Sequence, residues 1–88
     1  MKAKWLNYEF TVYGSPDTVT WNDVPGIYVF CGLNQADRWV SYYLGKVESF
    51  KNRLPNHERW KEAARLGATR VHAMVVQQGP AGTQLNRN

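Results

Sequence analysis

The sequence holds only one cysteine, Cys31, among its 88 residues. One thiol cannot form a disulfide within the chain or build a cysteine zinc cluster, so two common ways of stabilising a small domain are excluded. We therefore expect Cys31 to act as a small buried apolar residue.

Long apolar runs are also missing. No stretch approaches the roughly 20 apolar residues that a membrane-spanning helix needs. The opening residues, MKAKWLNYE, lack the apolar segment of a signal peptide. The sequence thus predicts a soluble, cytoplasmic protein without a membrane partner.

What the chain does have is enough hydrophobic residues for one small core. Hydrophobic residues make up 43% of the chain and aromatic residues 14%, a composition typical of folded proteins. A chain of this length supports a single domain. We expect one domain over residues 1–88, with its core in 24–76 and a loose polar tail over 77–88.

Positive charge is concentrated in one stretch of the chain. Between positions 46 and 70 there are seven basic and three acidic residues, so this stretch carries the whole net charge of +4. A basic cluster of this kind suits a polyanionic partner. The residues expected to contact it are Lys46, Lys51, Arg53, Arg59 and Lys61.

Hydrophobic patterning predicts three strands and two short helices. The β-branched and aromatic run 27–31 and the segment 39–44 are expected to form a hairpin, and 69–76 a third strand. A short edge strand is possible over 8–13.

Ser49 is a plausible N-cap for a helical turn that ends at Pro55, and Asn56 can cap a second helix over 57–66 that stops at Gly67. In this second helix, Trp60, Ala63 and Ala64 are expected on the buried face.

Two tripeptides stand out within the predicted hairpin. Gly26-Ile27-Tyr28 lies on its first strand and Tyr43-Leu44-Gly45 on its second, and Lys46, Arg53 and His57 follow in that order. This ordered set closely resembles the GIY-YIG nuclease superfamily over about positions 24–76, whereas either tripeptide alone carries little information.

The resemblance implies an α+β fold with a small three-stranded antiparallel sheet flanked by helices. It also implies hydrolysis of DNA phosphodiesters assisted by Mg²⁺ or Mn²⁺. By motif position, Tyr28 and Tyr43 would be the paired tyrosines, one of them the base that activates water. Lys46 would lower the pKa of a tyrosine, Arg53 would hold the scissile phosphate, and His57 would lie near the reacting centre.

Elementary chemistry fits these roles. A guanidinium presents a planar fork of donors that can bind two phosphate oxygens at once, which suits Arg53. A phenol has a pKa near 10 and needs a nearby cation to act as a base. Tyr43 and Gly45, two residues apart, should share one strand face, while Lys46 is expected beyond the strand end.

The sequence departs from the family at the metal site. The family holds its metal with a glutamate on a helix after the third strand, but here the last acidic residue is Glu62 and residues 77–88 stand in that place. We therefore expect the final helix and the metal ligand to be missing, and cleavage to be weak or absent. Glu58 and Glu62 are more typical of a solvated helix face with local ion pairs.

A missing helix would leave part of the sheet uncovered, which predicts either a homodimer or packing by the N-terminal segment. Three functions stay open. The chain could be a DNA-binding, nuclease-like protein, or an active endonuclease completed by a carboxylate from a partner chain or from Glu58 or Glu62. The third possibility is a protein-interaction module. Without the motif, the two tyrosines would be ordinary cross-strand packing, and His72 is expected to be structural.

Overall fold

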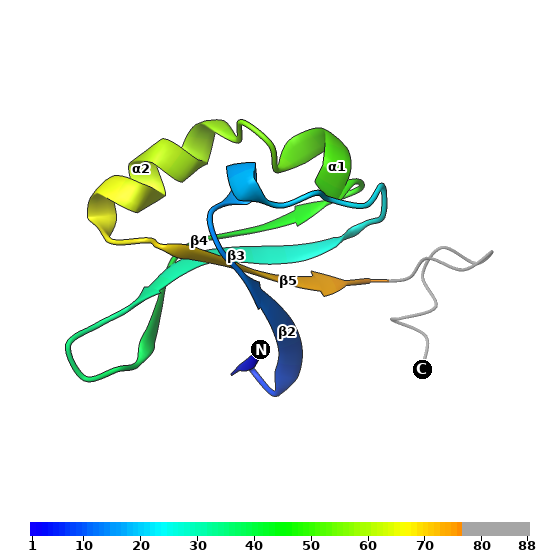
Figure 1. Cartoon of the computed structure of the whole chain (residues 1–88). Coiled ribbons are helices and arrows are strands. Elements are labelled where there is room, and N and C mark those ends of the chain that lie inside the picture. Colours follow the sequence, from blue (N-terminus) through cyan, green and yellow to red (C-terminus); the bar gives the residue numbers. More distant parts are fainter. Residues whose placement is uncertain (77–88) are drawn as a thin grey trace.

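Five antiparallel strands form one curled sheet in the computed structural model, which describes residues 1–76 (Figure 1). The sheet order is β1-β2-β5-β3-β4. The strands are β1 (Lys2–Trp5), β2 (Tyr8–Tyr13), β3 (Gly26–Leu33), β4 (Trp39–Val47) and β5 (Arg70–Val75).

The α+β class is confirmed, but the expected number of strands was wrong. The three predicted strands are β3, β4 and β5, which form one half of the sheet. The expectations of a loose tail and of a missing final helix fall on residues 77–88, outside the described part of the chain.

Strand β3, which lies between β5 and β4, is buried on both faces, and this explains its uninterrupted apolar sequence. Tyr28 and Phe30 point toward the helices, while Val29 and Cys31 point to the other face. All four are at most 3% exposed. Cys31 thus has the buried packing role expected from the sequence.

The unpredicted strand β1 is joined to β2 by a two-residue turn. Trp5 pairs with Tyr8, and the turn residues Leu6 and Asn7 have φ angles of 50° and 72°. Two consecutive positive φ angles are typical of the tight hairpin turn that matches strand twist. This turn normally contains glycine, so Leu6-Asn7 gave only a weak signal for it.

The hairpin β1–β2 covers the sheet face opposite the helices. β2 pairs with β5 only over Thr11–Tyr13, and Phe10 packs with Val29 and Cys31. Figure 1 shows β2 crossing beneath the other strands. Packing by the N-terminal segment, one of the two expected outcomes, is therefore observed, and a homodimer stays a prediction.

The helices lie together on the other face of the sheet (Figure 1). They are the 3-10 turn η1 (Pro16–Thr18) and the α-helices α1 (Phe50–Arg53) and α2 (Glu58–Leu66). Within the described residues 1–76, no helix has the length and apolar character needed to cross a membrane. Phe50, Leu54 and Ala63 bury their side chains against Phe30 and Val71.

Helix ends follow the expectation in part. Ser49 caps α1, because its hydroxyl accepts the Asn52 amide, and Gly67 ends α2 at a φ of 129°. The N-cap of α2 is His57, not Asn56, which adopts a left-handed conformation with φ 59°. Ala64 is exposed, so the buried face of α2 is narrower than predicted.

Candidate phosphate-binding site

The two tripeptides meet in the structure because Tyr28 of β3 lies directly opposite Gly45 of β4. A β-carbon on Gly45 would overlap the ring and hydroxyl of Tyr28. Gly26 is equally constrained, since a β-carbon there would overlap the Phe50 ring at the start of α1. The glycines thus allow close approach, one for Tyr28 and the other for α1.

A β-bulge at Tyr42 puts two consecutive tyrosines of β4, Tyr42 and Tyr43, on the helix side of the sheet. Phe30 pairs with Tyr43 and Cys31 with Ser41, so Tyr42 is the extra residue in β4. Bulges re-aim side chains at such positions. Tyr42 packs against the helix-side core, and Tyr43 stacks beside Tyr28 on the same side, with ring centroids 6.1 Å apart.

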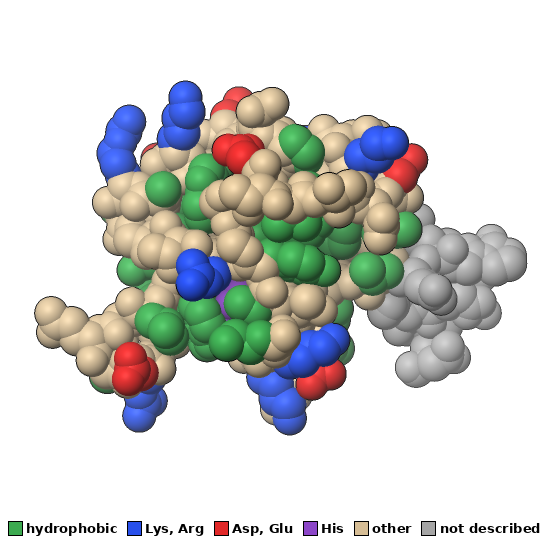
Figure 2. Space-filling model, in the orientation of Figure 1, with side chains coloured by type: hydrophobic (Ala, Val, Ile, Leu, Met, Phe, Trp, Pro, Cys, Tyr) green, Lys and Arg blue, Asp and Glu red, His purple; other side chains and the backbone are tan. Residues whose placement is uncertain are grey.

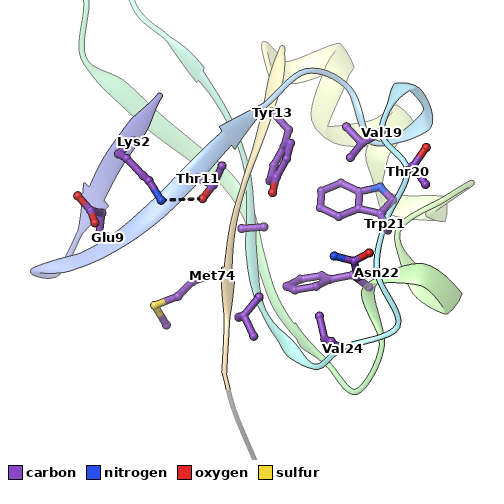
Figure 3. A pocket seen from close by; sticks show the side chains of 13 residues that line it. Lys2, Glu9, Thr11, Tyr13, Val19, Thr20, Trp21, Asn22, Val24 and Met74 are labelled. Carbon is purple, nitrogen blue, oxygen red and sulfur yellow. Dashed lines mark hydrogen bonds between the residues drawn. The ribbon is translucent and has the colours of Figure 1, made fainter.

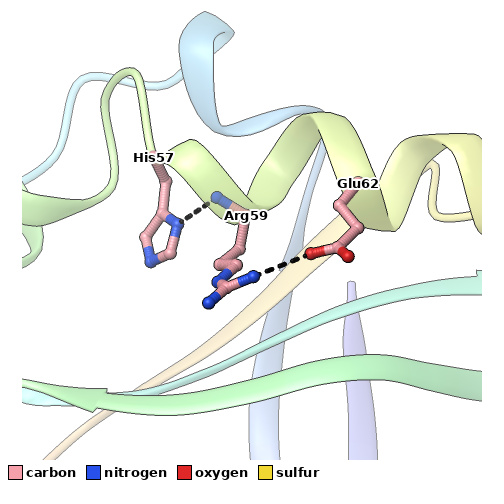
Figure 4. A network of polar contacts seen from close by, with 3 residues as sticks. All are labelled: His57, Arg59 and Glu62. Carbon is pink, nitrogen blue, oxygen red and sulfur yellow. Dashed lines mark hydrogen bonds and ion pairs between the residues drawn. The ribbon is translucent and has the colours of Figure 1, made fainter.

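His57 joins these tyrosines to α2. Its Nε2 lies 2.7 Å from the Tyr28 hydroxyl, and its Nδ1 accepts the Arg59 backbone N–H at 3.0 Å (Figure 4). The imidazole also lies edge-on to the Tyr43 ring, 5.8 Å between centroids. Burial, and then the nearby Arg53 charge, lower the pKa of His57, so the ring is neutral at neutral pH.

A polar cavity of about 320 Å³ opens beside this cluster. Six of its lining residues come from β4, α1, α2 and the connection between the helices: Tyr43, Asn52, Arg53, Asn56, His57 and Arg59. Of the predicted catalytic residues, Tyr43, Arg53 and His57 therefore share one cavity, and Tyr28 lies behind them, hydrogen-bonded to His57.

Arg53 and Arg59 bring two guanidinium groups to this cavity. Arg53 is exposed at the end of α1. Arg59 donates from Nη1 to Glu62 Oε1 at 3.0 Å (Figure 4), which is the local ion pair expected for this helix face. Both partners are more than half exposed, so solvent and salt weaken the pair and Arg59 can turn to another anion.

Tyr28 is not suited to be a base at neutral pH. Burial raises its pKa to about 12, and Tyr43 adds to the rise. The cation that lowers this pKa is Arg53; Lys46, expected to do so, is not among the causes. A phenol with so high a pKa holds its proton and serves as a hydrogen-bond donor or acceptor.

The expectation that Lys46 lies beyond the strand was wrong. Lys46 is inside β4, opposite Ile27, because the strand extends to Val47. By strand alternation its side chain leaves the sheet on the face opposite Tyr43 and Gly45. It lines a neighbouring cavity together with Ser49 and Arg53.

The other predicted DNA contacts are surface cations of the helix layer. Lys51 of α1 and Lys61 of α2 are both exposed and line neither of these two cavities. Figure 2 shows basic side chains projecting from the helix layer with acidic ones between them. The surface of the helix layer in this view is therefore mixed in sign, and Arg53 and Arg59 are two cations that line one cavity.

The cavity residues do not fit a divalent metal by themselves. Of the described residues, Glu58 is the one carboxylate that lines the cavity, and it is accompanied by Arg53 and Arg59. Among residues 1–76 there is no group of three or more histidine, cysteine, aspartate or glutamate side chains placed to hold a metal ion. A hard cation prefers several carboxylate or carbonyl oxygens, and the two guanidinium charges would repel it.

Another cavity, of about 280 Å³, lies between the N-terminal hairpin and the segment before β3 (Figure 3). Trp21 and Tyr13 line one side, and Lys2, whose ammonium donates to Thr11, lies on the other. None of the predicted site residues contributes to this cavity.

Sequence reasoning missed Asn52 and Asn56, which line the arginine cavity. No spacing rule marks them, because they belong to a short helix and its exit. The positive φ of Asn56 is compatible with its residue type, since asparagine tolerates this conformation.

The chain matches no protein-family model, no curated protein and no solved structure. The family assignment therefore stays a proposal that rests on the motif residues and on their arrangement.

Proposed function

We propose that this protein is a nuclease-like domain that binds the phosphodiester backbone of DNA at the arginine cavity. The observation that carries the proposal is the convergence of Tyr43, Arg53, His57 and Arg59 on one polar cavity. These residues come from three elements and the helix connection. Tyr43, Arg53 and His57 occupy motif positions of the GIY-YIG resemblance, and Arg59 is one of the predicted DNA contacts.

The chemistry of the cavity favours an anion with acceptor oxygens. Arg53 offers a fork of N–H donors, and Arg59 offers a second one across the cavity. The α2 amide of Arg59 is already bonded to His57, so contacts to a phosphate would come mainly from side chains. Tyr43, at 36% exposed, adds a hydroxyl and an aromatic face against which a sugar or base can pack.

The same geometry argues for weak or absent cleavage. Tyr28 holds its proton too firmly to activate water, since its pKa is about 12. Within the part of the chain that the structure describes, the cavity has one carboxylate, Glu58, next to two arginines. Metal-dependent hydrolysis would need a further carboxylate, for example from a partner chain, and this endonuclease is the alternative to binding alone.

The test is fluorescence anisotropy with a short labelled DNA duplex over a series of salt concentrations. Arg53→Ala should weaken binding about tenfold and reduce the salt slope by about one. Arg38→Ala is the matched control, because Arg38 lies in the β3–β4 loop, outside both arginine-lined cavities. Equal losses in both variants, or an affinity that ignores salt, would disprove the proposal.

A plasmid-nicking assay with Mg²⁺ or Mn²⁺ distinguishes binding from cleavage. Little or no nicking is expected from the wild-type protein. Efficient nicking that disappears in Arg53→Ala would replace the binding function by the endonuclease alternative.

A further inference from the structure

The protons at the candidate site can be assigned from two hydrogen bonds of His57. A neutral imidazole has one nitrogen that donates and one that accepts. Nδ1 accepts the Arg59 backbone N–H at 3.0 Å and must carry a lone pair. The ring proton is therefore on Nε2, which faces the Tyr28 hydroxyl at 2.7 Å.

It follows that the Tyr28 oxygen accepts a hydrogen bond from His57. Its own phenolic proton must point elsewhere. Tyr28 is 3% exposed and is covered by Phe30 on one side and Gly45 on the other. The Tyr43 ring, which also carries a hydroxyl, stacks beside Tyr28 with 6.1 Å between centroids, and Tyr43 lines the arginine cavity.

We infer that His57, Tyr28 and Tyr43 form a chain of hydrogen-bond donors whose direction is set by the N-cap of α2 and whose last proton points into the arginine cavity. The inference rests on the proposed function for the identity of the ligand, a phosphodiester. His57 and Tyr28 are positioning residues in this arrangement, and Tyr43 is the residue that touches the ligand.

This chain of hydrogen bonds makes the site selective for ligands that accept hydrogen bonds. The groups facing it are Arg53 from α1 and Arg59 and Glu58 from α2. The two arginines are donors only, and Tyr43 becomes a third donor because its acceptor side is turned toward Tyr28. Phosphodiester oxygens only accept, so they match this set, and chains of hydrogen bonds strengthen one another.

The direction of the protons is measured without any ligand. Long-range ¹H–¹⁵N correlation NMR of the neutral His57 ring should show a protonated Nε2 and an unprotonated Nδ1. The opposite tautomer would overturn the inference, because Tyr28 would then donate to His57 and the chain would run away from the cavity.

The contribution of these hydrogen bonds to DNA binding is measured by fluorescence anisotropy with the labelled duplex. Tyr43→Phe should weaken binding about tenfold and Tyr28→Phe about threefold, since the latter acts through Tyr43. His57→Asn retains a good N-cap for α2 but removes the contact with Tyr28, and about threefold weaker binding is expected. Thermal melting of each variant verifies that it is folded.

A double variant then separates positioning from direct contact. In the Tyr28→Phe background, His57→Asn should have almost no further effect, because the hydroxyl that His57 orients is gone. Independent losses that multiply would show that His57 acts by itself and would overturn the chain. If the wild-type protein binds no DNA, the proposed function fails, and the tautomer measurement still decides the proton direction.

Discussion

The two histidines of this chain make the same kind of hydrogen bond in opposite surroundings. His57 is half-buried beside the arginine cavity, and His72 is completely buried on the face covered by the N-terminal hairpin. Nδ1 of His57 accepts a backbone N–H, and Nδ1 of His72 accepts the Trp5 indole N–H at 2.9 Å. Each neutral ring therefore carries its proton on Nε2.

The difference lies in what each Nε2 meets. Nε2 of His57 faces the Tyr28 hydroxyl, whereas Nε2 of His72 has no hydrogen-bond partner among residues 1–76. The His72 ring instead packs edge-on against Trp39, 4.3 Å between centroids. The partly exposed, polar surroundings of His57 let it line the arginine cavity, whereas the sealed aromatic surroundings of His72 make it part of the core.

The largest effect is expected from His72 when the pH is lowered. Burial, and then Arg70, lower the pKa of His72 to about 4, below the value of ~6.5 for an unfolded histidine. Between these values only the unfolded chain binds the proton. The free energy of unfolding is therefore fully retained above about pH 6.5 and falls by ~3 kcal/mol as the pH decreases to about 4.

Chemical denaturation at a series of pH values measures this loss. His57 contributes a smaller loss of the same sign, because its pKa is also lowered. His72→Gln still offers an acceptor to Trp5 but cannot titrate, so it should remove most of the slope. A slope unchanged in His72→Gln would show that His72 is not the titrating group.

An intermediate effect on stability is expected from Gly45→Ala, beside Tyr28. The new methyl group would overlap Tyr28, so we expect a loss of ~2 kcal/mol in the free energy of unfolding and strongly weakened DNA binding. Gly14→Ala is the matched control, because its β-carbon would meet only Thr18 Oγ1, at 3.4 Å. Wild-type stability and affinity in Gly45→Ala would contradict the close packing of Tyr28.

The smallest effect is expected from removing the hydrogen bond between Trp5 and His72. Trp5→Phe removes the donor to His72 but keeps an aromatic ring, and should lower the free energy of unfolding by ~1 kcal/mol. Trp39→Phe is its control, since within the described residues Trp39 meets His72 by ring packing. Both variants should retain wild-type DNA affinity. A marked loss of DNA affinity in Trp5→Phe would show that the helix side of the sheet and the side covered by the N-terminal hairpin are coupled.

Much of the helix side could be predicted from local sequence. The apolar run around Val29 predicted a buried strand, Ser49 predicted the start of α1, and Gly67 predicted the end of α2. These features depend on neighbours within a few residues, so a single sequence contains the necessary information. Tyr43 and Gly45 were also expected on one strand face, and both contact Tyr28.

The N-terminal half of the sheet was less predictable. β1 is four residues long and its turn, Leu6-Asn7, has no glycine. β2 was expected as an edge strand, yet it lies between β1 and β5. Its position depends on Phe10 and Trp5 finding partners in β3 and β5, which are contacts between distant parts of the chain.

The sequence by itself determined the order of most elements and the identity of the tyrosines, arginine and histidine that could meet. Only the tertiary structure decided how they meet. The strand register places Tyr43 opposite Phe30 and beside Tyr28, and the cap of α2 fixes which nitrogen of His57 holds its proton. Strand register and helix capping set these directions, because a side chain's hydrogen-bond geometry depends on partners that are far away in the sequence.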